Sequence, residues 1–196
     1  MTALMRPNPV RATLQAGGNA YGTMAFGFFS PGLMTILAAA GAGFVLLDTE
    51  HSGVGIETIK TQIAVSRGLG IVPMVRVPGC HYHLIAPMLD AGAMRIMVPM
   101  AQARQIASWC RYRPDGVRGV AFGMPHDDYG DGNVVQKLRQ ANERTLVIAL
   151  IETVAVIAVV TRLLRSSSGK PAVKYPQAAA PGAATASDTR NGSCRG

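Results

Sequence analysis

The chain has 196 residues, of which 48% are hydrophobic and 15% charged, a composition typical of a folded globular protein and not of a disordered one. The formal net charge is +8, but the basic residues are dispersed and the aromatic residues do not alternate with a basic run, so we expect no nucleic-acid partner. Three widely spaced cysteines and a first segment without an apolar core predict a cytoplasmic protein with reduced thiols.

The first half of the chain alternates between short apolar runs and segments with helical periodicity. Strand-like runs begin near residues 21, 44, 71 and 95. Three segments between them carry apolar side chains at helical spacing and are followed by glycines: Leu33, Ile36, Leu37 and Ala40; Ile56, Ile59 and Ile63; Leu84, Ile85, Met88 and Leu89. This alternation predicts βα units around a parallel sheet that is buried on both faces.

The pattern changes in the second half of the chain. Residues 111–132 are rich in glycine and proline and predict a long irregular loop, of the kind that is usually functional or mobile. A short helix over 134–142 and a fifth strand over 145–151 should follow. The apolar stretch 145–164 is long enough to cross a bilayer, but Glu152 near its middle would be costly there, so we expect a strand and a helix and no membrane.

The last part of the chain has a different composition. Residues 166–196 contain almost no large apolar side chain, which predicts a disordered, low-complexity tail. We therefore place one α/β domain at residues 1–165, made of about five βα units.

Polar side chains suited to chemistry follow the apolar runs. Asp48 and His51 follow one run, Arg76 ends the next and Glu152 follows the fifth. Because the active site of a parallel α/β barrel lies at the carboxyl ends of its strands, this placement indicates an enzyme.

Each of these residues also has a purely structural interpretation. The carboxylates of Asp48 and Glu50 would raise the basicity of His51 as a general base, or the turn is an ordinary solvated one. Arg76 would bind a substrate carboxylate or enolate oxygen, or form an internal salt bridge with Asp48 or Glu50. Glu152 is a candidate oxygen ligand for Mg²⁺ or Mn²⁺, but a single carboxylate is weak evidence for a metal.

Other candidate residues carry less information. Loop positions are the default interpretation for His81 and His83, and nothing local assigns a role to Asp90 at the end of the third helical segment. The run His126-Asp127-Asp128 contains metal-ligating residue types, but no spacing rule supports a site.

Seven short motifs, taken together and in this order, give the chain a resemblance to a known family. They are Asn8-Pro9-Val10, Leu46-Leu47-Asp48-Thr49-Glu50-His51, Pro73-Met74-Val75-Arg76-Val77-Pro78, Leu89-Asp90-Ala91-Gly92-Ala93, Val98-Pro99-Met100, Gly116-Val117-Arg118-Gly119 and Ile151-Glu152-Thr153. Over residues 8–158 the chain resembles the HpcH/HpaI-type class II pyruvate aldolases.

The resemblance implies a (β/α)8 TIM-type barrel, of which this chain would form a part. The implied enzyme binds the keto acid pyruvate on Mg²⁺ or Mn²⁺ and makes or cleaves a bond to an aldehyde. His51 would be the acid/base, Asp90 would increase its basicity, Arg76 would stabilise the enolate oxygen and Glu152 would be a metal ligand. Family members assemble as hexamers, so a homo-oligomer is a possible partner state.

Two departures from the family pattern bear on activity. Leu150 stands where family members usually carry a glutamine, and a later segment with the second metal carboxylate is absent. We therefore expect a truncated chain that is weakly active or inactive. The alternatives are a non-catalytic remnant that associates with a full-length homologue and a lyase of the citrate-lyase β type that acts on an acyl-CoA thioester.

Overall fold

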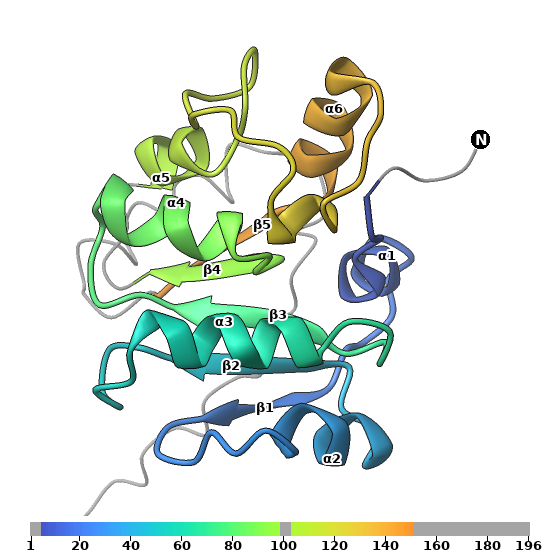
Figure 1. Ribbon diagram of the computed structural model, residues 1–196, viewed down its shortest axis with the longest axis vertical. Helices are drawn as coiled ribbons and strands as arrows, with labels where there is room; N and C mark the ends of the chain where they lie inside the picture. Colours follow the sequence, from blue (N-terminus) through green and yellow to red (C-terminus); the bar gives the residue numbers. More distant parts are fainter. Residues whose placement is uncertain (1–4, 99–102, 151–196) are drawn as a thin grey trace, which may run out of the picture.

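The computed structural model describes residues 5–98 and 103–150, which form a five-stranded parallel sheet with helices packed against it (Figure 1). Each strand pairs with its neighbours in the chain, in the order β1-β2-β3-β4-β5. The strands are β1 (Gly22–Ala25), β2 (Phe44–Asp48), β3 (Val72–Arg76), β4 (Arg95–Val98) and β5 (Leu146–Ala149). Sequential parallel order is the arrangement of a barrel wall, and the predicted α/β class is confirmed.

Helices cover one face of this sheet. They are α2 (Leu33–Ala39), α3 (Ile56–Val65), α4 (Tyr82–Asp90) and α5 (Ala103–Trp109). The main core forms where outward strand residues such as Val45, Leu47 and Val75 meet helix residues such as Ile59 and Ile85, all of them fully buried. The three predicted helical segments are thus confirmed as α2, α3 and α4, and each contributes buried apolar side chains to this contact.

The other face of the sheet has a smaller apolar cluster that includes Leu46, Val72 and Met74. Successive strand residues point to opposite faces, so continuous apolar runs supply both clusters. Val10 of α1 (Pro9–Gln15) joins the smaller cluster. Figure 1 shows α1 beside the ends at which the strands begin, and Asn8 attaches it there by donating from Nδ2 to the carbonyl of Arg144 (3.1 Å).

The sequence analysis did not predict the helices α1 and α5 (Ala103–Trp109). Each has seven residues, as α2 has, but polar side chains interrupt their sequences PVRATLQ and ARQIASW, so no apolar period stands out. The predicted helix over 134–142 is present as α6 (Val134–Arg144), and the predicted fifth strand as β5.

The predicted loop over 111–132 is irregular except for one 3-10 turn, Pro125–Asp127. Part of this loop is nevertheless packed against the rest of the domain. His126 and Asp127 are 0% and 1% exposed, and Lys137 of α6 binds Asp127 at 2.8 Å. Buried polar contacts fix this part of the loop, a feature that composition alone does not reveal.

Several predictions lie outside the described residues: the end of the fifth strand, Met100, Glu152, the following helix and the tail at 166–196. Within residues 5–98 and 103–150, no helix is both long and apolar enough to span a bilayer.

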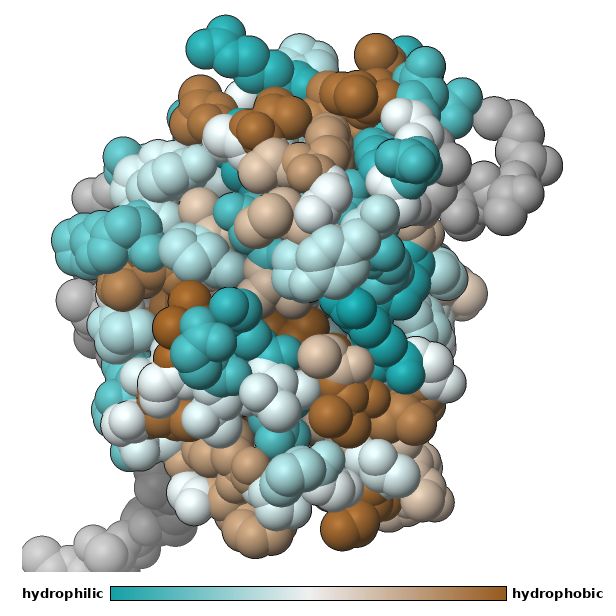
Figure 2. Space-filling model, in the orientation of Figure 1, coloured by the Kyte–Doolittle hydropathy of each residue, from teal (hydrophilic) through white to brown (hydrophobic). Residues whose placement is uncertain are grey.

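Figure 2 shows hydrophobic atoms at the surface over α2, in the lower part of the view. Ile36 of this helix is 62% exposed, although the sequence period placed it on the buried stripe. The helix turns this residue outward, while Leu33 and Met34 fill the core.

Candidate active site at the carboxyl ends of β2 and β3

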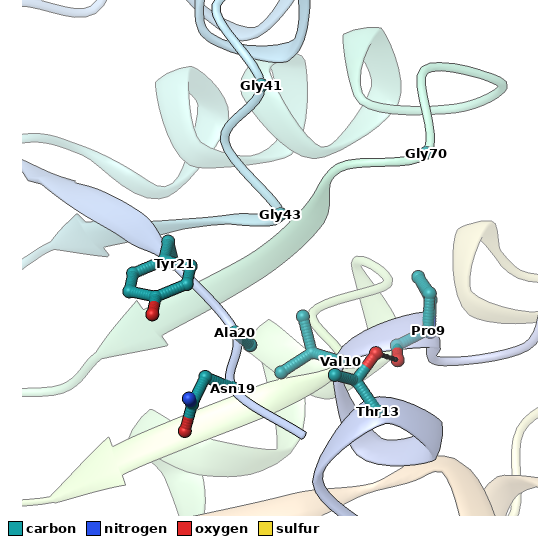
Figure 3. Close-up of a pocket in the computed structure, with 9 residues that line it drawn as sticks. All are labelled: Pro9, Val10, Thr13, Asn19, Ala20, Tyr21, Gly41, Gly43 and Gly70. Atoms are coloured by element: carbon teal, nitrogen blue, oxygen red, sulfur yellow. Dashed lines mark hydrogen bonds between the residues drawn. The ribbon is translucent and has the colours of Figure 1, made fainter. Parts of the chain in front are cut away.

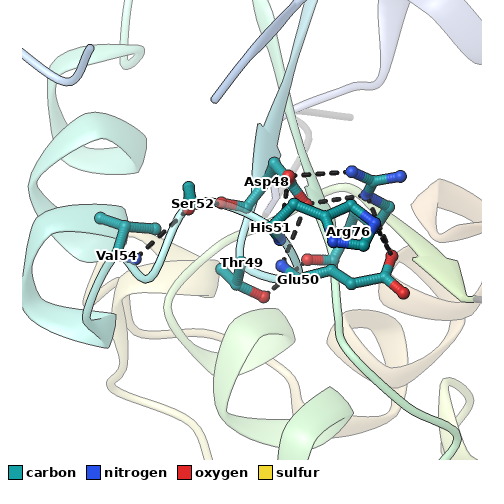
Figure 4. A network of polar contacts seen from close by, with 7 residues as sticks. All are labelled: Asp48, Thr49, Glu50, His51, Ser52, Val54 and Arg76. Atoms are coloured by element: carbon teal, nitrogen blue, oxygen red, sulfur yellow. Dashed lines mark hydrogen bonds and ion pairs between the residues drawn. The ribbon is translucent and has the colours of Figure 1, made fainter. Parts of the chain in front are cut away.

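Asp48 and Arg76 are the last residues of two neighbouring strands and stand side by side in the sheet register. Arg76 donates from Nε to Asp48 Oδ1 (2.7 Å) and from Nη2 to Asp48 Oδ2 (2.8 Å), as Figure 4 shows. The Asp48 side chain is fully buried and that of Arg76 is 13% exposed. This two-pronged contact fixes the plane of the guanidinium group.

Asp48 also organises the turn that follows β2. Its carboxylate accepts the backbone N–H groups of Glu50 (3.0 Å) and His51 (3.2 Å). The guanidinium of Arg76, helped by these two N–H groups, holds the pKa of Asp48 below its usual value against the opposing effect of burial. Asp48 is therefore ionised at neutral pH and holds both the turn and the arginine.

Glu50 brings the imidazole and the guanidinium to the same point. Its Oε2 lies 3.3 Å from Arg76 Nε and 3.7 Å from His51 Nε2. The His51 side chain is 64% exposed, so its ring is open to solvent at the edge of the site. Asp48, Glu50 and Arg76 thus form a charged, hydrogen-bonded floor of the site, and the accessible imidazole of His51 lies at its edge.

The two interpretations of Arg76 made from sequence can now be compared. The internal salt bridge with Asp48 and Glu50 exists. It does not exclude a substrate role, because a guanidinium that is already oriented loses less freedom when it binds an anion. The Arg76 Cζ atom also lies 5.9 Å from the centre of the Phe26 ring, which is half exposed beside it.

Asp90 ends α4 and is paired with a different arginine. Arg118 Nη2 donates to Asp90 Oδ1 at 2.6 Å, and Arg118 lies over the Tyr112 ring at 4.6 Å. The Arg118 side chain is 2% exposed. Among the described residues no direct contact joins Asp90 to His51, so its effect on that histidine stays a prediction.

Arg118 is the residue of this region to which the sequence analysis gave no role. The signal that could have found it is the run Gly116-Val117-Arg118-Gly119. A Cβ atom at Gly116 would overlap the carbonyl oxygens of Ser108 and Arg111. Glycine therefore lets the chain pass close to the end of α5, and this passage delivers Arg118 to Asp90.

The predicted metal ligand Glu152 lies outside the described residues, so its position is not part of this geometry. Within 5–98 and 103–150, no three His, Cys, Asp or Glu side chains gather as a metal-ion site. The run at 126–128 instead makes three separate contacts: His126 Nε2 with the Tyr112 hydroxyl (3.2 Å), Asp127 with Lys137 (2.8 Å) and Asp128 with Arg6 (2.9 Å).

Figure 3 shows a cavity of about 240 Å³ at the opposite end of the strands. It is lined by α1 residues such as Val10 and Thr13, by the segment before β1 and by the glycine turns that precede β2 and β3. It shares no residue with the Asp48 and Arg76 site.

Comparisons with known proteins identify the family of the chain. The model of the HpcH/HpaI aldolase/citrate lyase family matches residues 25–173. A hydroxypyruvate/pyruvate aldolase of Roseovarius nubinhibens is 31% identical over 80% of the chain and 62% of its own length. A 5-keto-4-deoxy-D-glucarate aldolase of Salmonella paratyphi A is 32% identical over 75% of the chain and 58% of its own length.

A solved structure is similar in the same way. The crystal structure of the HpcH/HpaI aldolase from Desulfitobacterium hafniense has a TM-score of 0.74 and 26% identity, over 79% of this chain and 61% of that one. The chain thus spans about three fifths of the length of the relatives it matches. The family model alone covers most of the chain, and the chain belongs to the HpcH/HpaI aldolase/citrate lyase family.

Proposed function

We propose that this chain carries the keto-acid end of an aldolase active site, which cleaves a 4-hydroxy-2-keto acid to pyruvate and an aldehyde. The observation that supports this most is the meeting of Arg76, Asp48, Glu50 and His51 at one edge of the sheet. The names of the two curated relatives, both aldolases, point to the same reaction class.

His51 is the proposed acid/base. In cleavage a base takes the proton of the 4-hydroxyl group, the bond between C3 and C4 breaks, the aldehyde leaves and the electron pair remains as the pyruvate enolate. The enolate is then protonated at C3. The His51 imidazole lies 3.7 Å from the Glu50 carboxylate and is exposed, so a substrate can reach it for both proton transfers.

Arg76 is the proposed partner of the enolate oxygen. Negative charge develops on this oxygen during cleavage, and a fixed guanidinium stabilises it without reorganising. Asp48 supplies that fixation through two hydrogen bonds and is a positioning residue. Asp90 is the proposed residue that increases the basicity of His51, with Arg118 holding its carboxylate.

A divalent cation belongs to this proposal with Glu152 as one ligand. When bound, Mg²⁺ or Mn²⁺ polarises the keto acid and holds it in the site. The described residues do not form such a site by themselves, so the roles of His51 and Arg76 are derived without it.

The test is retro-aldol turnover with a 4-hydroxy-2-keto acid, with pyruvate release as the readout. We expect His51→Gln to lower kcat/KM about 100-fold to 1000-fold, as loss of a general acid/base does. The matched control is His81→Gln, because His81 is also an exposed histidine and its ring stacks on His83 instead of joining the contacts of Asp48, Glu50 and Arg76. Its kcat/KM should stay within about threefold of the parent, the change expected of a surface substitution.

Turnover that survives His51→Gln would remove the acid/base assignment. Weak activity of this chain alone stays a prediction, so the assay is run on the chain alone and after mixing with a full-length family member. The keto-acid and aldehyde specificity is then read from a substrate series with the more active of the two samples.

A further inference from the structure

A second polar cavity, of about 350 Å³, lies near the amino ends of the strands. It is lined by Arg11, Arg111, Asp115, Arg139, Asn142 and Glu143. The three arginines come from three places: α1, the segment after α5, and α6. Arg11 Nη1 donates to the carbonyl of Thr145, the residue just before β5 (3.4 Å), so the cavity lies at the end of the strands opposite to Asp48 and Arg76.

Two carboxylates share this lining with the three arginines, so the lining carries a net charge of +1. Asp115 Oδ2 accepts a hydrogen bond from Asn142 (3.0 Å) and Glu143 is exposed. In the part of the chain that the structure describes, the guanidinium groups of Arg111 and Arg139 form neither an ion pair nor a hydrogen bond. Their donors are therefore available at the cavity.

Asn142 fixes the two walls that carry these arginines. Its Oδ1 accepts from the backbone N–H of Tyr112 (2.7 Å), and its Nδ2 donates to the carbonyl of Tyr112 (3.0 Å). Asn142 is on α6, three residues after Arg139, and Tyr112 directly follows Arg111. A ligand that used both guanidinium groups would thus meet walls that are already held together, which lowers the cost of binding.

A further positive charge, that of Arg95, is close enough to Arg11 for the two to repel each other. Arg95, at the start of β4, is 8% exposed, and its Nε has no hydrogen-bond partner. Burial, followed by repulsion from the charge of Arg11, lowers the pKa of Arg95 to about 10. An anion in the cavity would relieve this repulsion between like charges.

We propose that this cavity binds a phosphate group, either free phosphate or a phosphate monoester. Guanidinium groups give charged, forked hydrogen bonds to phosphate oxygens. Three of them approaching from three elements suit a tetrahedral dianion, whose oxygens point in several directions. A carboxylate has two oxygens in one plane and would leave part of this set unused.

The experiment is calorimetric titration and thermal unfolding of the full chain with inorganic phosphate and with phenyl phosphate, at constant ionic strength set with chloride. At a phosphate concentration ten times Kd we expect Tm to rise by about 3 °C, and chloride or acetate should give no rise. Phenyl phosphate as the stronger ligand would assign the site to a monoester, and inorganic phosphate as the stronger would assign it to the free ion.

The variants are Arg139→Gln and Arg111→Gln, each expected to weaken phosphate binding by about tenfold or more, the loss of a charged hydrogen bond. Arg104→Gln is the control, because Arg104 is exposed on α5 and does not line the cavity. Equal responses to phosphate and chloride, no saturable binding, or unchanged affinity in both cavity variants would each overturn the proposal. Arg139 is on the surface of α6, so its variant should fold normally, which the Tm without phosphate checks.

Discussion

The two ends of the same sheet handle charge in opposite ways. At the carboxyl ends, the buried Asp48 and the nearly buried Arg76 satisfy each other with two hydrogen bonds. At the amino ends, Arg95 is almost as buried, but its Nε has no partner and its charged neighbour is another arginine. A buried charge in a sheet can thus organise a site when a residue of opposite charge stands beside it in the sheet register. Without such a partner it destabilises the fold.

A third region keeps a titratable group neutral by burial. His126 has no exposed surface and lies against Tyr112 and the stacked ring of Phe122. Burial is the largest cause that lowers the pKa of His126 to about 4, followed by the charge of Arg118. Substitutions in these three regions, with exposed positions as controls, follow from this comparison, because each removes a charged or titratable group in a different setting.

Asp48→Asn should have the largest effect on stability. Removing one partner of a buried ion pair leaves an uncompensated charge and typically costs about 3–5 kcal/mol. Glu50 still lies near Arg76, so we expect the lower end of that range, about 3 kcal/mol, in the free energy of unfolding measured with urea. A loss below about 1 kcal/mol would mean that the pair is weakly coupled to the fold, as exposed pairs are.

His126 should make stability depend on pH on the acid side. The folded pKa of about 4 lies below the ordinary 6.5, so between these values the unfolded chain binds more protons than the folded one. The contribution of His126 is therefore complete above pH 6.5 and is lost as the pH falls toward 4, by up to about 3 kcal/mol.

The measurement is the free energy of unfolding between pH 4 and 7.5, for the parent and for His126→Gln. The variant should flatten the curve in this window, whereas His81→Gln, at an exposed position, should leave it unchanged. A variant curve parallel to that of the parent would assign the acid sensitivity to other groups, such as the carboxylates of Asp48 and Asp127.

Arg95→Met should change stability in the opposite direction to Asp48→Asn. It removes a buried charge without a counter-charge and keeps an apolar stem of similar length, so we expect a gain of about 1–2 kcal/mol. Urea denaturation of the variant measures this gain. A clear loss would show that Arg95 contributes through packing of its stem more than its charge costs.

Lys60→Met should change stability least, and it serves as the reference for an ion pair that is exposed. Lys60 binds Glu57 at 3.0 Å on the surface of α3, with side chains 45% and 80% exposed. Pairs of this kind contribute less than about 0.5 kcal/mol, so Tm should hardly move. A larger change would argue that exposed charge on this basic chain matters more than its geometry suggests.

The sequence was a good guide to the strands and to the helices whose apolar side chains recur at helical spacing. Apolar runs that end on Asp48 and Arg76 became neighbouring strands, and the periodic segments became α2, α3 and α4. These elements were predictable because burial imposes a regular spacing on side chains near one another in the chain. The helices α1 and α5 were missed, since polar side chains interrupt their short sequences, whereas the equally short α2 is almost entirely apolar.

The site was predictable only in part. Residue types and strand ends pointed to His51 and Arg76, and the family resemblance pointed to Asp90; the structure places the first two around Glu50. The pairing of Asp90 with Arg118 could not be read from spacing, because 28 residues separate them and the contact depends on how the loop passes α5. The run at 126–128 resembled a ligand set, yet its three side chains bind three different partners.

What the amino-acid sequence by itself determined is therefore the local pattern: which segments are strands or helices, which faces are apolar and which polar groups stand at strand ends. Only the tertiary structure decided which charges meet, joining Asp48 to Arg76 and leaving Arg95 near the like charge of Arg11. The reason is physical, since hydrophobic periodicity is written along the chain, whereas a hydrogen bond between distant residues requires an orientation that packing alone supplies.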